Sequence, residues 1–245
     1  MAMTERQTQL VVAAQNGDIK SFEELFTIFY ENVYALARMI TRNSSDAEYI
    51  LQETFITAWK KLDALEAPET FSVWLQIIAK NLCDMQLRMK NMAILLDAEK
   101  DIDNIDTEKS DKFLPAVYAE RADLKKRLGG VINDLSETQR QAIVLYYYNG
   151  LSVQEIADVL VCSANTVKTR LFLARETIRS EIEEQERKCG EKLFAITGIP
   201  MLPLFKLIRS QMESFSIGQS AVGASLSAIK NSITPPAAEA APGEV

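Results

Sequence analysis

The sequence predicts an all-α protein with two small helical domains, an acidic flexible linker between them and a C-terminal extension. Two observations favour this fold class. Apolar residues recur at three- and four-residue intervals in both halves of the chain, and helix-capping residues precede these runs. Strands alternating with helices are not apparent. We expect the domains at residues 1–90 and 127–188, the linker at 91–126, and an extension at 189–245 whose end is disordered.

The first long helix of the N-terminal domain is predicted to begin after Asp18, whose carboxylate can cap it. A wide apolar stripe follows at helical spacing, which is most simply the core of the domain. Its members are Phe22, Leu25, Phe26, Phe29, Val33, Tyr34, Leu36 and Ala37.

A second helix is predicted from a capping box formed by Ser45 and Glu48. Its inner face would be made by Ile50, Leu51, Phe55, Ala58 and Trp59. Gln52, Glu53 and Lys60 would then face solvent. By themselves, an exposed glutamine and glutamate indicate only ordinary surface.

A third helix is expected from Phe71 to about Arg88, after a polar turn that contains Pro68. Trp74, Leu75, Ile78 and Leu82 would face inward, and the opposite side carries Lys80, Asn81, Asp84, Gln86 and Arg88. Single-stranded nucleic acid is held by stacking, base-edge hydrogen bonds and cations, so this polar side has suitable chemistry. We assign Trp74 to the core in preference to a stacking wedge.

Between Asp97 and Lys112 the chain has seven acidic residues, three lysines and little apolar content. This composition favours a solvated, flexible linker, with a short acidic helix as the alternative. It also accounts for part of the net charge of −7.

The segment from Leu151 to Arg179 predicts a helix-turn-helix. Ser152 and Glu155 form a capping box, the turn lies at Val161 to Ser163, and a second helix begins at Ala164. Val167, Leu171 and Ala174 would face inward, leaving the polar and basic residues Asn165, Thr166, Lys168, Thr169, Arg170 and Arg175 outside. Such a face fits the major groove of DNA, where phosphate contacts position the helix and short polar side chains reach base edges. The alternative is an ordinary solvated surface helix.

The composition argues against most kinds of enzyme. The chain has no histidine, and Cys83, Cys162 and Cys189 are widely separated, so neither a zinc site nor a cysteine–histidine pair can be assembled. No glycine-rich phosphate loop appears. We expect no cofactor and no catalytic activity. Unpaired cysteines and the lack of a signal-peptide pattern favour the cytoplasm.

Motifs in both halves of the chain carry a family resemblance. LSETQRQAIVLYYYNGL at Leu135 to Leu151, EIA at Glu155 to Ala157 and TVKTRL at Thr166 to Leu171 resemble region four of bacterial sigma factors, most closely the extracytoplasmic-function (ECF) group. Upstream, DAE at Asp46, QETF at Gln52 and AW at Ala58 resemble region two of the same family.

The resemblance implies three surfaces. Ser163, Asn165, Thr166, Lys168, Thr169, Arg170 and Arg175 would bind the minus-thirty-five promoter element. Lys80, Asn81, Asp84 and Arg88 would bind the melted minus-ten element. Asp46, Gln52, Glu53 and Phe55 would contact the clamp helices of the largest subunit of RNA polymerase core.

The sequence departs from the family pattern at several positions. Tyr49 replaces an acid that often follows Asp46-Ala47-Glu48, Val161 replaces the usual turn glycine, and Leu173 stands where a polar residue is common. The resemblance implies a protein that selects promoters as part of the polymerase holoenzyme. The alternative is a helix-turn-helix regulator that binds DNA without polymerase core.

The C-terminal extension contains an apolar cluster from Leu193 to Ile208, interrupted by Lys206 and too short to span a bilayer. Three roles remain open for it: it packs back on the domains, docks on a regulatory protein, or lies at a membrane surface. The corresponding partner would be an anti-sigma factor or a membrane-associated regulator. The last residues, TPPAAEAAPGEV, are expected to be disordered.

Overall fold

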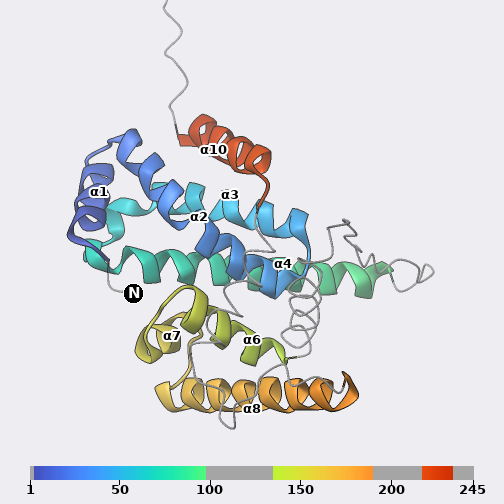
Figure 1. Ribbon diagram of the computed structural model, residues 1–245. Helices are drawn as coiled ribbons and strands as arrows, with labels where there is room; N and C mark the ends of the chain where they lie inside the picture. Colours follow the sequence, from blue (N-terminus) through green and yellow to red (C-terminus); the bar gives the residue numbers. More distant parts are fainter. Residues whose placement is uncertain (1–2, 98–134, 190–216, 234–245) are drawn as a thin grey trace, which may run out of the picture.

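A computed structural model describes residues 3–97, 135–189 and 217–233, and their regular structure is entirely helical (Figure 1). The α-helices are α1 (Glu5–Gln15), α2 (Ile19–Thr41), α3 (Ser44–Lys60), α4 (Phe71–Asp97), α6 (Glu137–Ile143), α7 (Val153–Val159), α8 (Ala164–Cys189) and α10 (Gln219–Ile233). Two 3-10 turns lie at Leu62–Ala64 and Pro68–Thr70, and a π-helical turn spans Val144–Tyr148. The all-α prediction is confirmed. Most of the expected linker, the cluster from Leu193 to Ile208 and the last twelve residues lie outside the described ranges.

An aromatic cluster between α2 and α3 forms the centre of the N-terminal half. The rings of Phe26 and Phe55 meet edge to face with centroids 4.8 Å apart, and Trp59 meets Phe22 in the same way at 5.0 Å. Edge-to-face pairs add to the stabilisation that burial of the rings provides. The predicted apolar stripe of α2 is therefore core, and Asp18 caps the helix by accepting from the backbone N–H of Lys20.

The start of α3 differs from the prediction. Its N-cap is Asn43, whose Oδ1 accepts from the backbone N–H of Asp46 at 3.0 Å, and Ser45 already lies inside the helix. The reason lies in the preceding turn. Arg42 ends α2 in the left-handed conformation (φ 55°), so Asn43 is the first extended residue after it and takes the capping position.

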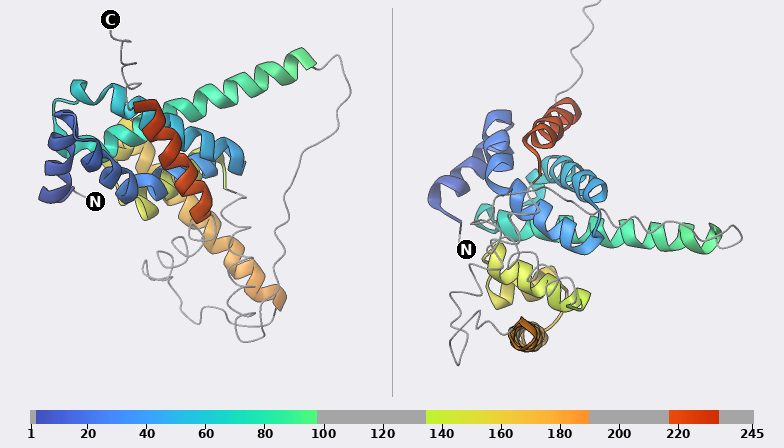
Figure 2. Two further views of the ribbon diagram at one scale, coloured as in Figure 1. Left: turned by 90° about the horizontal axis from the view of Figure 1, so that it is seen from above. Right: turned by 45° about the vertical axis from the view of Figure 1, so that its right-hand side comes forward.

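Helix α4 is longer than expected. It continues past Arg88 and past residue 90, the domain boundary predicted from the sequence, to Asp97. Leu75, Ala79 and Cys83 are fully buried, and Trp74 packs at the edge of the core beside Phe71, as assigned. The C-terminal part of α4 projects away from the other helices (Figure 2).

Helices α6, α7 and α8 form a second layer below α2 and α4 (Figure 1). A capping box of Ser136 and Gln139 starts α6, and the π-helical turn continues it to Tyr148. The two halves are in contact where α7 meets α4 and where α6 meets α2.

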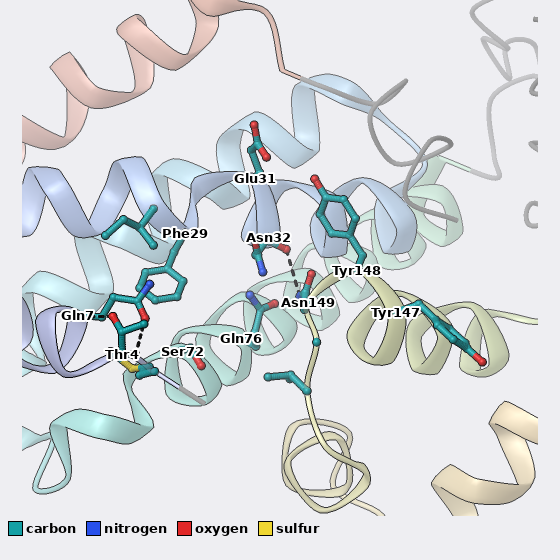
Figure 3. A pocket seen from close by; sticks show the side chains of 14 residues that line it. Thr4, Gln7, Phe29, Glu31, Asn32, Ser72, Gln76, Tyr147, Tyr148 and Asn149 are labelled. Carbon is teal, nitrogen blue, oxygen red and sulfur yellow. Dashed lines mark hydrogen bonds between the residues drawn. The ribbon is translucent and has the colours of Figure 1, made fainter. Parts of the chain in front are cut away.

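A pocket of about 320 Å³ lies at the junction of the two halves (Figure 3). The side-chain amide of Asn149 donates to the backbone oxygen of Asn32 across this junction at 3.3 Å. The wall includes Gln76 and Asn149, whose buried side-chain amide oxygens accept no hydrogen bond from the described part of the protein. The junction is thus partly polar.

Helix α10 lies on the opposite side of the molecule from α8, against α3 (Figures 1 and 2). Ile217, Ser225 and Ile229 are buried there. Within the described residues, no helix is long and apolar enough to cross a membrane.

Candidate nucleic-acid interface

The helix-turn-helix is built as the sequence predicts. Ser152 Oγ accepts from the backbone N–H of Glu155 at 3.2 Å, and the Glu155 carboxylate accepts from the N–H of Ser152 at 2.6 Å. The N–H of Cys162 then donates to the carbonyl of Ala157 at 3.0 Å, the hydrogen bond that closes a helix in a Schellman motif. These contacts fix the angle at which α8 leaves α7.

Val161 occupies the left-handed position of this turn, with φ 49°. Glycine adopts that conformation without steric cost, but the β-branched valine does not. Val161 is 88% exposed, so packing against neighbouring side chains does little to hold it in this conformation. The departure from the family's usual glycine therefore places strain directly before α8.

The N-terminal half of α8 presents the polar face expected to meet DNA. Ser163 caps the helix, accepting from the N–H of Thr166 at 3.1 Å, and Thr166 is partly covered. Asn165, Lys168 and Thr169 are exposed on the following turns. The inner face is made by Val167, Leu171, Ala174 and Ile178, all buried.

The two arginines assigned to this face are less available than Lys168. Arg170 is partly buried, with its guanidinium 3.7 Å from the sulfur of Cys162. Arg175 is partly buried and is bonded to the π-helical turn. Its Nε donates to the phenol oxygen of Tyr147 at 2.8 Å, and its guanidinium lies 5.8 Å and 5.6 Å from the ring centroids of Tyr146 and Tyr147.

Arg175 is thus only partly exposed, and its side chain is bonded to the preceding turn, which the sequence pattern did not predict. The aromatic residues of the π-helical turn attract its cation, an interaction that spacing along α8 does not reveal. Burial raises the pKa of the Tyr147 phenol, and the hydrogen bond from Arg175 opposes that shift. The phenol is the acceptor and stays protonated at neutral pH.

The second expected surface, on α4, combines one ion pair with two freely exposed side chains. Lys80 Nζ lies 2.6 Å from Asp84 Oδ2, one helical turn away, and the lysine side chain is only 15% exposed. Asn81 and Arg88 are exposed. The ion pair holds the Asp84 carboxylate in place, while Asn81 and Arg88 remain able to meet a strand.

On α3, Asp46 is tied to α4 by two interactions. Its carboxylate pairs with Lys90 and accepts from the side-chain amide of Gln86 at 3.3 Å. The Asp46 side chain is only 14% exposed, and its two contacts hold α3 in position against α4. Neither Gln86 nor Lys90 was assigned this contact from the sequence, because helical periodicity does not give the register between two helices.

Of the other residues expected on the polymerase-binding surface, Phe55 is buried in the core and Gln52 is partly covered by α10. Phe55 is fully buried between Phe22 and Phe26, so direct contact with a partner is excluded in this conformation. Gln52 Nε2 donates to Ser225 Oγ of α10 at 3.3 Å, although we expected it to face solvent. Glu53 is partly exposed.

No group of three or more cysteine and carboxylate side chains in the described ranges is arranged to hold a metal ion. The described residues instead form binding surfaces: a basic helix α8, a polar face on α4 and a helical surface on α3. These surfaces suit contacts with nucleic acid and with another protein.

Comparison with known proteins decides the family. The family model "Sigma-70 region 2" matches residues 25–91, and "Sigma-70, region 4" matches residues 125–178. The ECF RNA polymerase sigma factor SigW of Bacillus subtilis is 31% identical over 174 residues, covering 69% of this chain and 93% of that protein. The chain belongs to the ECF sigma factors of the sigma-70 family.

Other relatives of this sigma factor agree. The ECF RNA polymerase sigma-E factor of Haemophilus influenzae is 31% identical over 180 residues, which are 71% of this chain and 94% of the relative. An ECF sigma factor is a transcription initiation factor, and the chain has that function. The match to both regions in the family's order confirms the resemblance inferred from the sequence motifs.

Two solved structures have the same fold. The structure of CnrH in complex with the cytosolic domain of CnrY is matched with a TM-score of 0.52 at 24% identity, over 74% of this chain and 99% of that one. The sigma factor RpoE in complex with the anti-sigma factor NepR, from Bartonella quintana, is matched with a TM-score of 0.54 at 22% identity, over 67% and 98%.

Proposed function

We propose that this sigma factor directs RNA polymerase core to promoters whose minus-thirty-five element is read by the N-terminal half of α8. The observation that carries the proposal is the exposure of Asn165, Lys168 and Thr169 on a capped helix that follows a tight turn. Lys168 would contact phosphate, and the short polar side chains would reach base edges in the major groove. Ser163, Thr166 and Arg170 would support that contact from the helix start and flank.

The minus-ten element is assigned to α4. In this proposal the exposed amide of Asn81 reads an unpaired base and Arg88 holds the backbone of the melted strand. Lys80 and Asp84 are already paired with each other, so either they act as a unit or DNA must replace one partner of the pair.

Polymerase core is assigned to α3, with Gln52 and Glu53 as the direct contacts to the clamp helices of the largest subunit. Asp46 acts in this scheme by positioning α3 through its contacts with Lys90 and Gln86. The residues assigned to core and to DNA lie on different helices, so one molecule can use both surfaces at once.

The same proposal includes regulation, compartment and domain limits. We assign the extension at 189–245 to binding an anti-sigma factor or a membrane-associated regulator. The protein acts in the cytoplasm, where polymerase and promoters meet, and has no catalytic activity of its own. The two domains are assigned to residues 1–90 and 127–188, with the acidic linker between them.

Run-off transcription tests the proposal. Purified core polymerase is mixed with a library of promoter fragments, with and without the sigma factor, and transcripts are sequenced. Specific initiation that requires both core and sigma factor is expected. Stable, sequence-specific DNA binding by the protein alone, with no effect on core polymerase, would instead support the core-independent regulator.

A further inference from the structure

The C-terminal helix α10 covers the part of α3 to which polymerase core is assigned. Helices α3 and α10 are separated by most of the chain, yet they are packed along each other (Figure 1). The side-chain amide of Gln52 donates to the hydroxyl of Ser225 at 3.3 Å, across 173 positions of sequence. A side chain expected to contact polymerase is therefore already bonded within the chain.

The inner face of α10 is suited to close contact. Ser225 is fully buried and Ile229 is 1% exposed, while Ala221, Val222 and Leu226 are partly buried against the same core. Small side chains at Ala221 and Ser225 allow the two helix backbones to approach. At the far end of the contact, Lys230 Nζ lies 2.9 Å from Glu23 Oε1 of α2.

Helix α10 is weak as an isolated element. It has fifteen residues, a length at which a helix in water is marginal without packing. Gly223 lies inside it, on the exposed side, and a methyl group at that position would meet nothing within 4 Å. Glycine in a helix interior favours the unfolded state relative to alanine. The stability of α10 therefore depends on its packing against α3.

We propose that α10 is an intramolecular competitor that occupies the polymerase-binding surface of α3 and must leave before core binds. This inference rests on the proposed assignment of Gln52 and Glu53 to core. A protein whose binding-competent state is a minor fraction shows an affinity reduced by that fraction. Displacing α10 therefore raises the affinity for core, and strengthening α10 lowers it.

Two substitutions change α10 in opposite directions without altering α3. Ser225→Leu places a branched side chain in a fully buried site against α3 and displaces the helix. Gly223→Ala favours the helix from its exposed side, by roughly two- to fivefold in the docking equilibrium. Ser227→Leu is the matched control for the first change, because it replaces serine by leucine on the exposed face of the same helix.

The experiment measures the dissociation constant of each full-length variant for purified core polymerase by fluorescence anisotropy. Hydrogen exchange of residues 219–233 reports whether α10 is docked. We expect Ser225→Leu to bind core about tenfold more tightly and lose protection of α10. Gly223→Ala should bind roughly two- to fivefold more weakly, and Ser227→Leu should match the unchanged protein.

A Ser225→Leu chain that exposes α10 but binds core no better than Ser227→Leu, or more weakly, would overturn the proposal. In that case α10 simply completes the fold of the N-terminal half. Gln52→Ala with Glu53→Ala, made in the Ser225→Leu chain, separates this failure from failure of the underlying assignment. If that triple variant retains full affinity for core, α3 is not the polymerase surface at all.

Discussion

Arg175 Nε donates to the phenol oxygen of Tyr147 at 2.8 Å and thereby joins the recognition helix to the π-helical turn that precedes α7. This hydrogen bond is partly buried, and the guanidinium also lies near the face of both neighbouring tyrosine rings. These contacts support the position of α8.

Arg175→Ala should lower the stability of the C-terminal half by about 2 kcal/mol, because it removes a charged hydrogen bond and the cation–π contacts. Thermal melting would measure the loss. Arg179→Ala is the control, since its exposed pair with Glu176 at 3.1 Å should contribute little. Normal melting of Arg175→Ala together with weakened promoter binding would restore Arg175 to the DNA surface.

Lys168→Ala should weaken binding of the holoenzyme to promoters without unfolding the protein, because the lysine is exposed on α8. Loss of one phosphate contact reduces the slope of log affinity against log salt by about 0.9. The slope is obtained from binding titrations at several salt concentrations. Lys20→Ala, at an exposed site in the first turn of α2, removes the same charge elsewhere and should leave the slope unchanged. An unchanged slope for Lys168→Ala would mean that another face of α8 meets DNA.

Val161→Gly should stabilise the protein by about 1 kcal/mol. The left-handed conformation costs a valine about 1–3 kcal/mol, and part of the gain is offset by the greater freedom of glycine in the unfolded chain. Calorimetry should find Tm raised by about 2–4 °C. Val161→Ala keeps a β-carbon at the same site and should gain less; an equal gain for alanine would locate the strain in the branched side chain instead of the left-handed turn.

Cys83 should resist alkylation until the protein unfolds. Burial in the core raises the pKa of its thiol to about 12, so the reactive thiolate is nearly absent at pH 8. In a Cys189→Ser background, iodoacetamide should modify the partly exposed Cys162 first, and Cys83 only in denaturant. Peptide mass spectrometry distinguishes the two sites. Rapid labelling of Cys83 in the native protein would contradict the packing of α4.

Gln52→Ala with Glu53→Ala should abolish association with core polymerase while leaving helix content and melting nearly unchanged. Neither side chain belongs to the buried set of α3. Co-purification with core measures the effect. The matched control, Glu5→Ala with Gln9→Ala, removes the same two residue types from exposed positions on α1. Equal recovery of both double variants with core would remove the assignment.

Local signals in the sequence predicted local structure well. The capping box of Ser152 and Glu155 and the cap at Asp18 are both formed, because each depends on residues within one helical turn. The start of α3 was missed because the left-handed Arg42 shifts the cap to Asn43. In the sequence alone, Ser45 with Glu48 three residues later offered an equally good local pattern.

Contacts between distant segments could not be predicted in this way. Periodicity placed Gln52 on the outer side of α3, which is correct for the isolated helix, but gave no sign that Ser225 would cover it. The same limit explains Asp46, whose partner Lys90 lies on another helix. The weak apolar pattern of α10, with serine and alanine on its inner face, offered little signal of a packed helix.

The hydrogen bond from Asn149 to the backbone of Asn32 has a consequence for how the protein meets a promoter. Elements centred about 25 base pairs apart are separated by roughly 85 Å along duplex DNA, which over that length behaves as a stiff ruler. The halves to which we assign these elements are here in direct contact. Under this assignment, a full promoter is read at both elements only after the junction between the two halves opens.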